Sequence, residues 1–158
     1  MYRRAVVALD GSPVAEAIIP FILEIAGPLD MEVVLVRVNR PVAPAVIEGS
    51  RHVMVEDPEM SRVDAEEYLA PLAIELRKKG VRARTEVRRG QPSEEIVLAA
   101  RETGADLIAM TTHGRSGFGR LLFGSVAEAV LRESRLPVLL MRVTEAQVAA
   151  RATQVAVR

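Results

Sequence analysis

Short apolar blocks alternate along the chain with segments of helical period. Four blocks, 5–9, 33–36, 107–110 and 138–141, are unbroken by polar residues and consist mainly of aliphatic or β-branched side chains. Such runs are typical of strands buried on both faces of a sheet. The segment 81–87 instead alternates apolar with charged residues, which predicts a half-exposed strand at a sheet edge.

The segments between these blocks repeat their apolar positions with the period of a helix. The predicted helices cover about 13–26, 61–79, 93–103 and 125–133. Ser12 followed by Pro13 marks an N-cap and a first helical position. Gly80 and Gly104 are expected to end the second and third helices. Pro20 should kink or split the first helix, because proline removes a backbone donor and clashes with the preceding turn.

Alternation of strands with helices determines the expected fold class. Parallel neighbours in a sheet need a crossover, which is usually a helix, so the pattern predicts an α/β fold with one doubly wound, five-stranded parallel sheet covered on both faces. A chain of 158 residues fits one domain. We expect this domain over residues 1–143 and a C-terminal tail over 144–158.

Two stretches have no clear place in this pattern. The connection 39–60 contains Pro41, Pro44 and Pro58, and we expect a long mobile loop with one short turn of helix. Loops of that length are uncommon in compact domains unless they have a function. The tail 144–158 is rich in Ala and Val, and it is either a helix that packs on a partner or a frayed end.

Composition narrows the class of function. Lys plus Arg and Asp plus Glu both number 21, so nothing favours a general electrostatic hold on nucleic acid or on a membrane. The chain has no cysteine, which excludes disulfides and thiolate metal sites and fits a reducing compartment. No apolar run approaches the length of a membrane span. We therefore expect a soluble, cytoplasmic protein that binds neither nucleic acid nor membrane.

The segment 110–125 carries the strongest chemical signal. It follows a predicted buried strand, contains three closely spaced glycines at 114, 117 and 119, and ends in Gly124-Ser125 at a helix start. Glycines let backbone N–H groups approach phosphate oxygens, and a helix N-terminus adds positive potential. A bound phosphate is the functional interpretation. The alternative is that the glycines only allow a surface loop to turn.

The same segment resembles the universal stress protein family. ATP-binding members carry a G-x-x-G-x9-G-[S/T] loop after the fourth strand, and Gly114 and Gly124-Ser125 hold its later positions, while Thr111 stands in place of the first glycine. The similarity runs from about residue 3 to 142. It also includes the segments Val6 to Ser12, Val36-Arg37-Val38, Gly90-Gln91-Pro92, Glu94-Glu95-Ile96 and Pro137 to Leu140.

This resemblance implies a Rossmann-like fold, a ligand and an assembly. The implied strand order is 3-2-1-4-5, and the implied ligand is ATP or another adenine nucleotide. If the chain is a slow hydrolase or phosphotransferase, we expect Mg²⁺ to be held by the phosphates together with Asp10. The resemblance further implies a homodimer through the edge of the fifth strand, Pro137 to Arg142, which would cover that edge. The resemblance therefore implies a regulatory module in the stress response. The sequence does not identify its protein partner.

Roles are assigned by resemblance only at matching positions. Asp10 is expected to face the adenine or ribose, with the backbone of Ala8 and Leu9 nearby, and Val38 to contact the base. The nucleoside should be bordered by Met110 and Thr111. The expected phosphate cradle consists of Gly114, Gly124, Ser125 and Val126, with Arg115 as a charge partner. The cradle lies beyond the carboxyl ends of strands one and four, where open α/β sheets bind ligands.

The polar residues in and near these segments also have simpler, structural interpretations. Asp10 before Gly11-Ser12 is of the type that makes a turn and caps a helix. His113 has no acidic neighbour in sequence to orient it as a base. Arg115 and Arg120 are also consistent with plain surface charges. Glu94 and Glu95 fit an acidic first helical turn better than an acid/base pair.

Motifs of fast enzymes are absent from the sequence. There is no P-loop lysine motif, no G-x-G-x-x-G after the first strand, no G-x-S-x-G and no H-E-x-x-H. Three hypotheses follow. The first is a nucleotide-binding regulatory module without a catalytic residue, the second is a slow ATP hydrolase or phosphotransferase, and the third is a dimeric interaction protein of the same family that binds no nucleotide.

Overall fold

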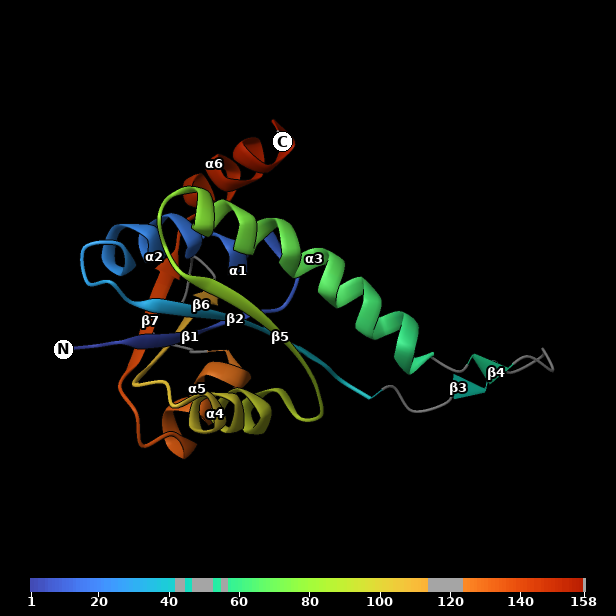
Figure 1. Ribbon diagram of the computed structural model, residues 1–158. Coiled ribbons are helices and arrows are strands. Elements are labelled where there is room, and N and C mark those ends of the chain that lie inside the picture. The colour runs from blue at the N-terminus through green and yellow to red at the C-terminus, as the bar shows by residue number, and fades with distance from the viewer. Residues whose placement is uncertain (42–44, 47–52, 55–56, 114–123, 158) are drawn as a thin grey trace.

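The structure, a computed structural model, describes residues 1–41, 45–46, 53–54, 57–113 and 124–157. Its main sheet has five parallel strands in the order β5-β2-β1-β6-β7 (Figure 1). Numbered along the chain, this is the expected order 3-2-1-4-5. The five strands are β1 Arg4–Leu9, β2 Glu32–Asn39, β5 Ala83–Arg89, β6 Leu107–His113 and β7 Val138–Val143.

Helices cover both faces of this sheet (Figure 1). One face carries α1 Pro13–Glu16, α2 Ile19–Ala26, α3 Pro58–Lys78 and α6 Glu145–Ala156, and the other carries α4 Pro92–Thr103 and α5 Ser125–Glu133. The side chains of β1 alternate between the two cores: Val7 packs against the α1, α2 and α3 side, and Val6 against the α4 and α5 side. Both valines are fully buried, as a strand covered on both faces requires.

The first predicted helix is split into two. Helix α1 ends at Glu16 and α2 begins at Ile19, with Pro20 in the first turn of α2. A proline is tolerated there because the N–H it lacks would have no partner inside the helix. The predicted caps are also present: the Ser12 side chain caps α1, and Gly104 ends α4 in the left-handed conformation.

Helix α3 begins earlier than its apolar period indicated. It starts at Pro58 rather than near residue 61, because Asp57 serves as its N-cap and accepts a hydrogen bond from the amide of Glu59 at 2.9 Å. The first turns of α3 are largely exposed, so the apolar pattern carried no signal for them. Only the cap chemistry, Asp followed by Pro, marks the true start.

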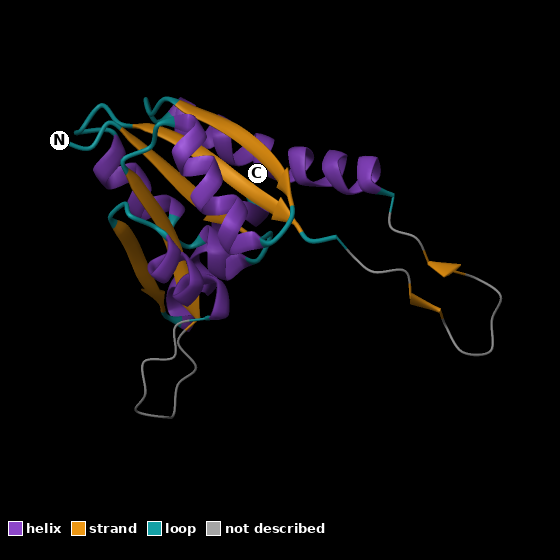
Figure 2. Cartoon of the chain, turned by 90° about the horizontal axis from the view of Figure 1, so that it is seen from below, coloured by secondary structure: helices purple, strands orange, loops and turns teal. Residues whose placement is uncertain are grey.

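The connection 39–60 differs from the expected loop with a single turn of helix. Its described part holds a two-stranded antiparallel sheet of β3 Ala45–Val46 and β4 Val53–Met54. This hairpin and the start of α3 extend away from the five-stranded sheet in both views (Figures 1 and 2). Strands of two residues are too short to produce a recognisable alternation in the sequence.

The tail forms the helix α6, which packs on its own chain rather than ending in a frayed segment. Thr144 and Gln147 form a capping box at its start: the Thr144 hydroxyl accepts from the Gln147 amide at 3.3 Å, and the Gln147 side chain accepts from the Thr144 amide at 2.9 Å. Among the described helices, including α6, none combines the length and apolar character that crossing a membrane requires.

Candidate nucleotide site

A cavity of about 480 Å³ opens at the carboxyl ends of β1, β2 and β6. Strand order reverses between β1 and β6, because the chain first builds the sheet outward through β2 and β5 and then returns to the other side of β1. Open α/β sheets bind their ligands at such a switch point. The volume lies within the range of small-molecule pockets, roughly 300–1,000 Å³.

The turn after β1 forms one wall. The Asp10 carboxylate accepts a hydrogen bond from the amide of Ser12 at 2.9 Å, and the Ser12 hydroxyl accepts one from the amide of Ala15 at 3.1 Å. Gly11 between them has a φ of +89°, a conformation that favours glycine. Asp10 therefore makes the turn that the simpler interpretation proposed and also lines the cavity. Within the described residues, its Oδ2 accepts no hydrogen bond.

The N-terminus of α5 forms the opposite wall. Gly124 is the N-cap of this helix, and no side chain of the described residues caps its first amides. Among the described residues, no heavy atom lies within 4 Å of the position that a β-carbon of Gly124 would occupy. Uncapped amides and the helix dipole together favour an anion at this position. Ser125, the first helical residue, also lines the cavity and adds a hydroxyl donor.

The floor between these walls is apolar. It consists of Val36 and Val38 from β2, Ile96 from α4 and Met110 from β6. Val36, Ile96 and Met110 are almost fully buried in the α4 and α5 core. An apolar floor with a carboxylate on one side and free amides on the other suits a ligand with a flat apolar part, hydroxyl groups and an anionic end.

All the predicted site residues that the structure describes lie at this cavity. They are Ala8, Leu9, Asp10, Val38, Met110, Thr111, Gly124, Ser125 and Val126. Gly114 and Arg115 lie outside the described residues, as do Gly117, Gly119 and Arg120. His113 is the last residue of β6, and its side chain is likewise outside the described part.

Several lining residues were not predicted. They are Ser12, Val14, Ala15, Val36, Arg40, Pro92, Ile96, Thr112 and Ala127. Arg40 could have been found, since it follows β2 at the same carboxyl edge as Val38. The side chain of Arg40 is exposed and forms no ion pair within the described part of the chain, so it is a positive group at the β2 side of the cavity.

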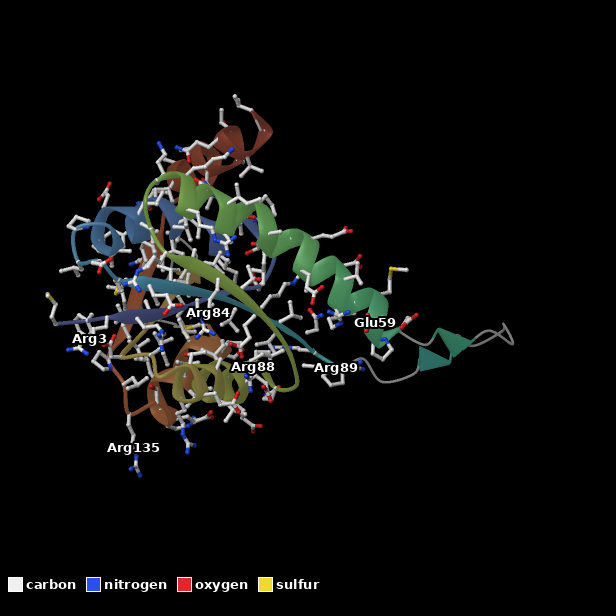
Figure 3. The ribbon with its side chains drawn as sticks, in the orientation of Figure 1. Arg3, Glu59, Arg84, Arg88, Arg89 and Arg135 are labelled. Carbon is white, nitrogen blue, oxygen red and sulfur yellow. The ribbon has the colours of Figure 1, made fainter. Side chains whose placement is uncertain are left out.

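Glu94 and Glu95 occupy the first turn of α4, as their spacing indicated. The Glu95 carboxylate accepts a hydrogen bond from Nε of Arg88 at 2.7 Å, and Arg88 also pairs with Glu86 and Glu102. Figure 3 shows Arg88 on the α4 side of β5. Glu95 is therefore engaged in an ion-pair network outside the cavity lining, which leaves it no part in acid/base chemistry there.

Carboxylates capable of holding a metal are scarce at this site. Of the described residues that line the cavity, Asp10 alone is acidic. In the described part of the chain, no group of three or more His, Asp or Glu side chains is placed to bind a metal ion. A single carboxylate can still share a Mg²⁺ ion with phosphate oxygens, which is the usual way that Mg²⁺ is held with nucleotides.

Sheet order, crossover helices and cavity position together define a doubly wound α/β protein with a ligand-sized cavity at its switch point. The model of the universal stress protein family matches residues 1–142. Universal stress protein MJ0531 of Methanocaldococcus jannaschii is 34% identical over 145 residues, which cover 90% of this chain and 83% of that protein. The chain belongs to the universal stress protein family.

Solved structures of the family have the same fold. A universal stress protein family member from Burkholderia pseudomallei is 29% identical, with a TM-score of 0.66, and the match covers 89% of this chain and 96% of that one. The universal stress protein of Archaeoglobus fulgidus in complex with dAMP is 26% identical, with a TM-score of 0.62, over 88% of this chain and 97% of its own.

Proposed function

We propose that this chain binds an adenine nucleotide, ATP in preference, in the cavity at the carboxyl ends of β1, β2 and β6. The observation that carries the proposal is the combination of the uncapped N-terminus of α5, the Asp10 carboxylate and an apolar floor around a single cavity. Each part of a nucleotide finds a chemically matched group there.

The phosphates belong at the α5 end of the cavity. Backbone amides after Gly124 and the Ser125 hydroxyl are donors, and the helix dipole favours negative charge. The nucleoside then extends toward β1 and β2. Asp10 is placed to accept hydrogen bonds from ribose hydroxyls or from the adenine amino group, and Val38 and Met110 to contact the base.

A relative that holds a bound nucleotide supports the choice of an adenine nucleotide. The Archaeoglobus fulgidus protein holds dAMP, an adenine nucleotide with a single phosphate. The preference for ATP rests on the resemblance of the loop that ends in Gly124-Ser125 to the loop of ATP-binding family members. Gly114 and Arg115, which that resemblance adds to the phosphate end, are assigned there on the resemblance alone.

A regulatory role fits the cavity better than rapid catalysis. The lining holds one described carboxylate, and none of the described lining residues is a histidine or lysine that could act as a proton acceptor for an attacking water. We therefore propose a regulatory module whose surface changes when a nucleotide binds in the cavity. A slow hydrolase, with Mg²⁺ shared between phosphates and Asp10, is the second candidate, because Oδ2 of Asp10 is left without a hydrogen bond by the described residues.

Identifying the small molecule that copurifies with the chain tests the proposal. We expect mass spectrometry of the denatured protein to release an adenine nucleotide, and titration calorimetry of the stripped protein to show saturable ATP binding with a weaker response to GTP. Release of inorganic phosphate with Mg²⁺ separates the hydrolase from the regulatory module. If the chain neither retains nor binds an adenine nucleotide, the proposal is wrong. The hypothesis that then stands is a dimeric interaction protein of the same family that binds no nucleotide.

A further inference from the structure

The C-terminal helix α6 lies beyond the residues matched by the family model, which end at 142, yet it places a charged side chain in the interior. Arg151 is only 2% exposed. Its Nη1 and Nη2 donate to the carboxylate of Glu75 on α3 at 2.9 and 2.8 Å. Its Nε lies 3.5 Å from Oε2 of Glu16, the last residue of α1. One side chain therefore connects α6 with both α1 and α3.

The negative charge of Glu16 acts on two other members of this buried cluster, Arg151 and Tyr68. The Tyr68 hydroxyl on α3 and the Nε of Arg151 are both buried, and neither has a hydrogen-bond partner among the described residues. Burial and the charge of Glu16 both raise the pKa of Tyr68, so its hydroxyl stays protonated. A carboxylate as buried as Glu16 is strongly unfavourable without a cation, and Arg151 supplies that cation.

Tyr68 and Arg37 connect this cluster with the turn at the cavity wall. The Arg37 guanidinium lies 4.9 Å from the centre of the Tyr68 ring, the geometry of a cation–π contact. The same guanidinium lies 3.3 Å from the position that a β-carbon of Gly11 would occupy. Gly11 is the middle residue of the turn that carries Asp10 into the cavity wall. Arg37 therefore lies against this turn and against the Tyr68 ring.

Helix α1 provides a second route to the same turn. It spans four residues, a length that is not stable as an isolated helix, so its position depends on contacts at its two ends. The Ser12 hydroxyl caps the first end, and Glu16 at the second end is held by Arg151. Figure 1 shows α6 over the same face of the sheet as α1 and α3.

We propose that Arg151 is a positioning residue for the nucleotide site: by holding Glu16 and Glu75 it fixes α1 and α3, the helix that carries Tyr68 of the Tyr68–Arg37 contact, and through them the turn at Asp10, Gly11 and Ser12. The proposal rests on the nucleotide binding proposed above. It makes the C-terminal helix, which lies outside the family match, part of the machinery that sets nucleotide affinity.

The full-length Arg151→Met variant tests the proposal, because methionine keeps much of the volume and removes the charge. We expect the Kd for ATP to rise about fivefold or more, the lower end of typical coupling between distant sites. We also expect the backbone amide signals of Gly11 and Ser12 to shift in a ¹⁵N–¹H spectrum without ligand. Thr144→Ala is the matched control, since it removes the capping box of α6 but leaves Arg151 in place.

A second variant separates positioning from stability. Arg151→Met leaves Glu16 without its cation, and the double variant Arg151→Met with Glu16→Gln removes that charge, so we expect thermal stability to recover while ATP affinity stays weak. A folded Arg151→Met protein with the wild-type Kd and unmoved Gly11 and Ser12 signals would overturn the proposal. So would a double variant that recovers stability and affinity together.

The same measurements distinguish failure of the inference from failure of the proposed function. If the wild-type chain binds no adenine nucleotide, the proposed function is wrong, and the amide signals of Gly11 and Ser12 in the ligand-free variants still decide whether Arg151 positions the turn. If the wild type binds ATP and the variants bind it equally well, only the role of Arg151 is wrong.

Discussion

Asp10 joins two functions in one side chain. One oxygen of its carboxylate accepts the Ser12 amide and closes the turn after β1, and the carboxylate as a whole lines the cavity. Asp, Asn and Ser are favoured in turns for the same local hydrogen bonds, so the sequence alone could not separate a structural Asp10 from a ligand-binding one. The structure places it at the cavity without removing the turn.

Substitution at Asp10 separates the two functions. Asn can still accept the Ser12 amide but has no charge, whereas Ala loses both. If the carboxylate binds the nucleoside, both variants should bind ATP about tenfold more weakly, which corresponds to about 1.4 kcal/mol. Calorimetry measures the two Kd values. A wild-type affinity in Asp10→Asn would assign Asp10 to the turn alone.

Site residues that fall in the family's motifs were predictable, including Ser125 and Val126 at the start of α5, whereas residues that reach the cavity only through packing were not. Val38, Met110 and Thr111 were assigned from the family resemblance, and their place agrees with the rule that ligands bind beyond the carboxyl ends of parallel strands. Ile96 reaches the cavity from α4, and its place depends on how that helix packs over β1 and β2, which no local pattern encodes. Arg151 is hidden from sequence reasoning for the same reason: its partners are distant in the chain.

Capping residues gave the helix boundaries where apolar periodicity could not. Ser12 and Gly104 were identified from local chemistry and hold those roles in the structure. The start of α3 and the hairpin of β3 and β4 were missed, because exposed helical turns and two-residue strands have no apolar pattern. The tail left two alternatives open, since the buried residue of α6 is Arg151, which pairs with Glu16 and Glu75, and the helix has no buried apolar stripe.

The C-cap of α4, Gly104, allows a test of how far this helix end stabilises the fold. Helix α4 also supplies Pro92 and Ile96 to the cavity. Gly104 has a φ of +67°, and a β-carbon there would meet its nearest atom at an ordinary 3.5 Å, so backbone conformation alone opposes a side chain. Gly104→Ala should lower the free energy of unfolding by about 1–2 kcal/mol. Urea denaturation measures this value.

Gly27 is the matched control for this substitution. It caps α2 with a φ of −60°, and a β-carbon would again meet its nearest atom at 3.5 Å. Gly27→Ala should therefore leave the free energy of unfolding unchanged or raise it by roughly 0.5 kcal/mol. Equal losses in both variants would show that the left-handed conformation at Gly104 is not the cause.

At the scale of the whole molecule, the alternation of strands and helices predicted the fold class, and the strand order came from the family resemblance. Both agree with the structure. The two edges of the sheet differ: β5 presents charged residues, whereas Val138, Leu139, Leu140 and Met141 of β7 are only half-buried apolar side chains. An apolar edge strand without cover invites pairing with another strand.

We propose that two copies of the chain pair through β7, as the resemblance implied. Leu140→Arg should weaken the dimer by at least about tenfold in Kd, since a charge would enter the apolar edge. Thr85→Arg, on the opposite edge strand β5, is the control and should not change the assembly. Sedimentation velocity measures both. A monomeric wild type, or a dimer that tolerates Leu140→Arg, contradicts the proposal.

The central claim is that phosphates bind at the uncapped start of α5, and Gly124→Val tests it most directly. Gly124 has a φ of −56°, which valine adopts without strain, and its β-carbon would meet no heavy atom of the described residues within 4 Å, so the fold should survive. Calorimetric titration with Mg-ATP should show saturable binding by the wild type and a loss of at least about a hundredfold, or about 2.7 kcal/mol, in the variant. Equal ATP affinity in the two proteins, at equal thermal stability, would contradict the account.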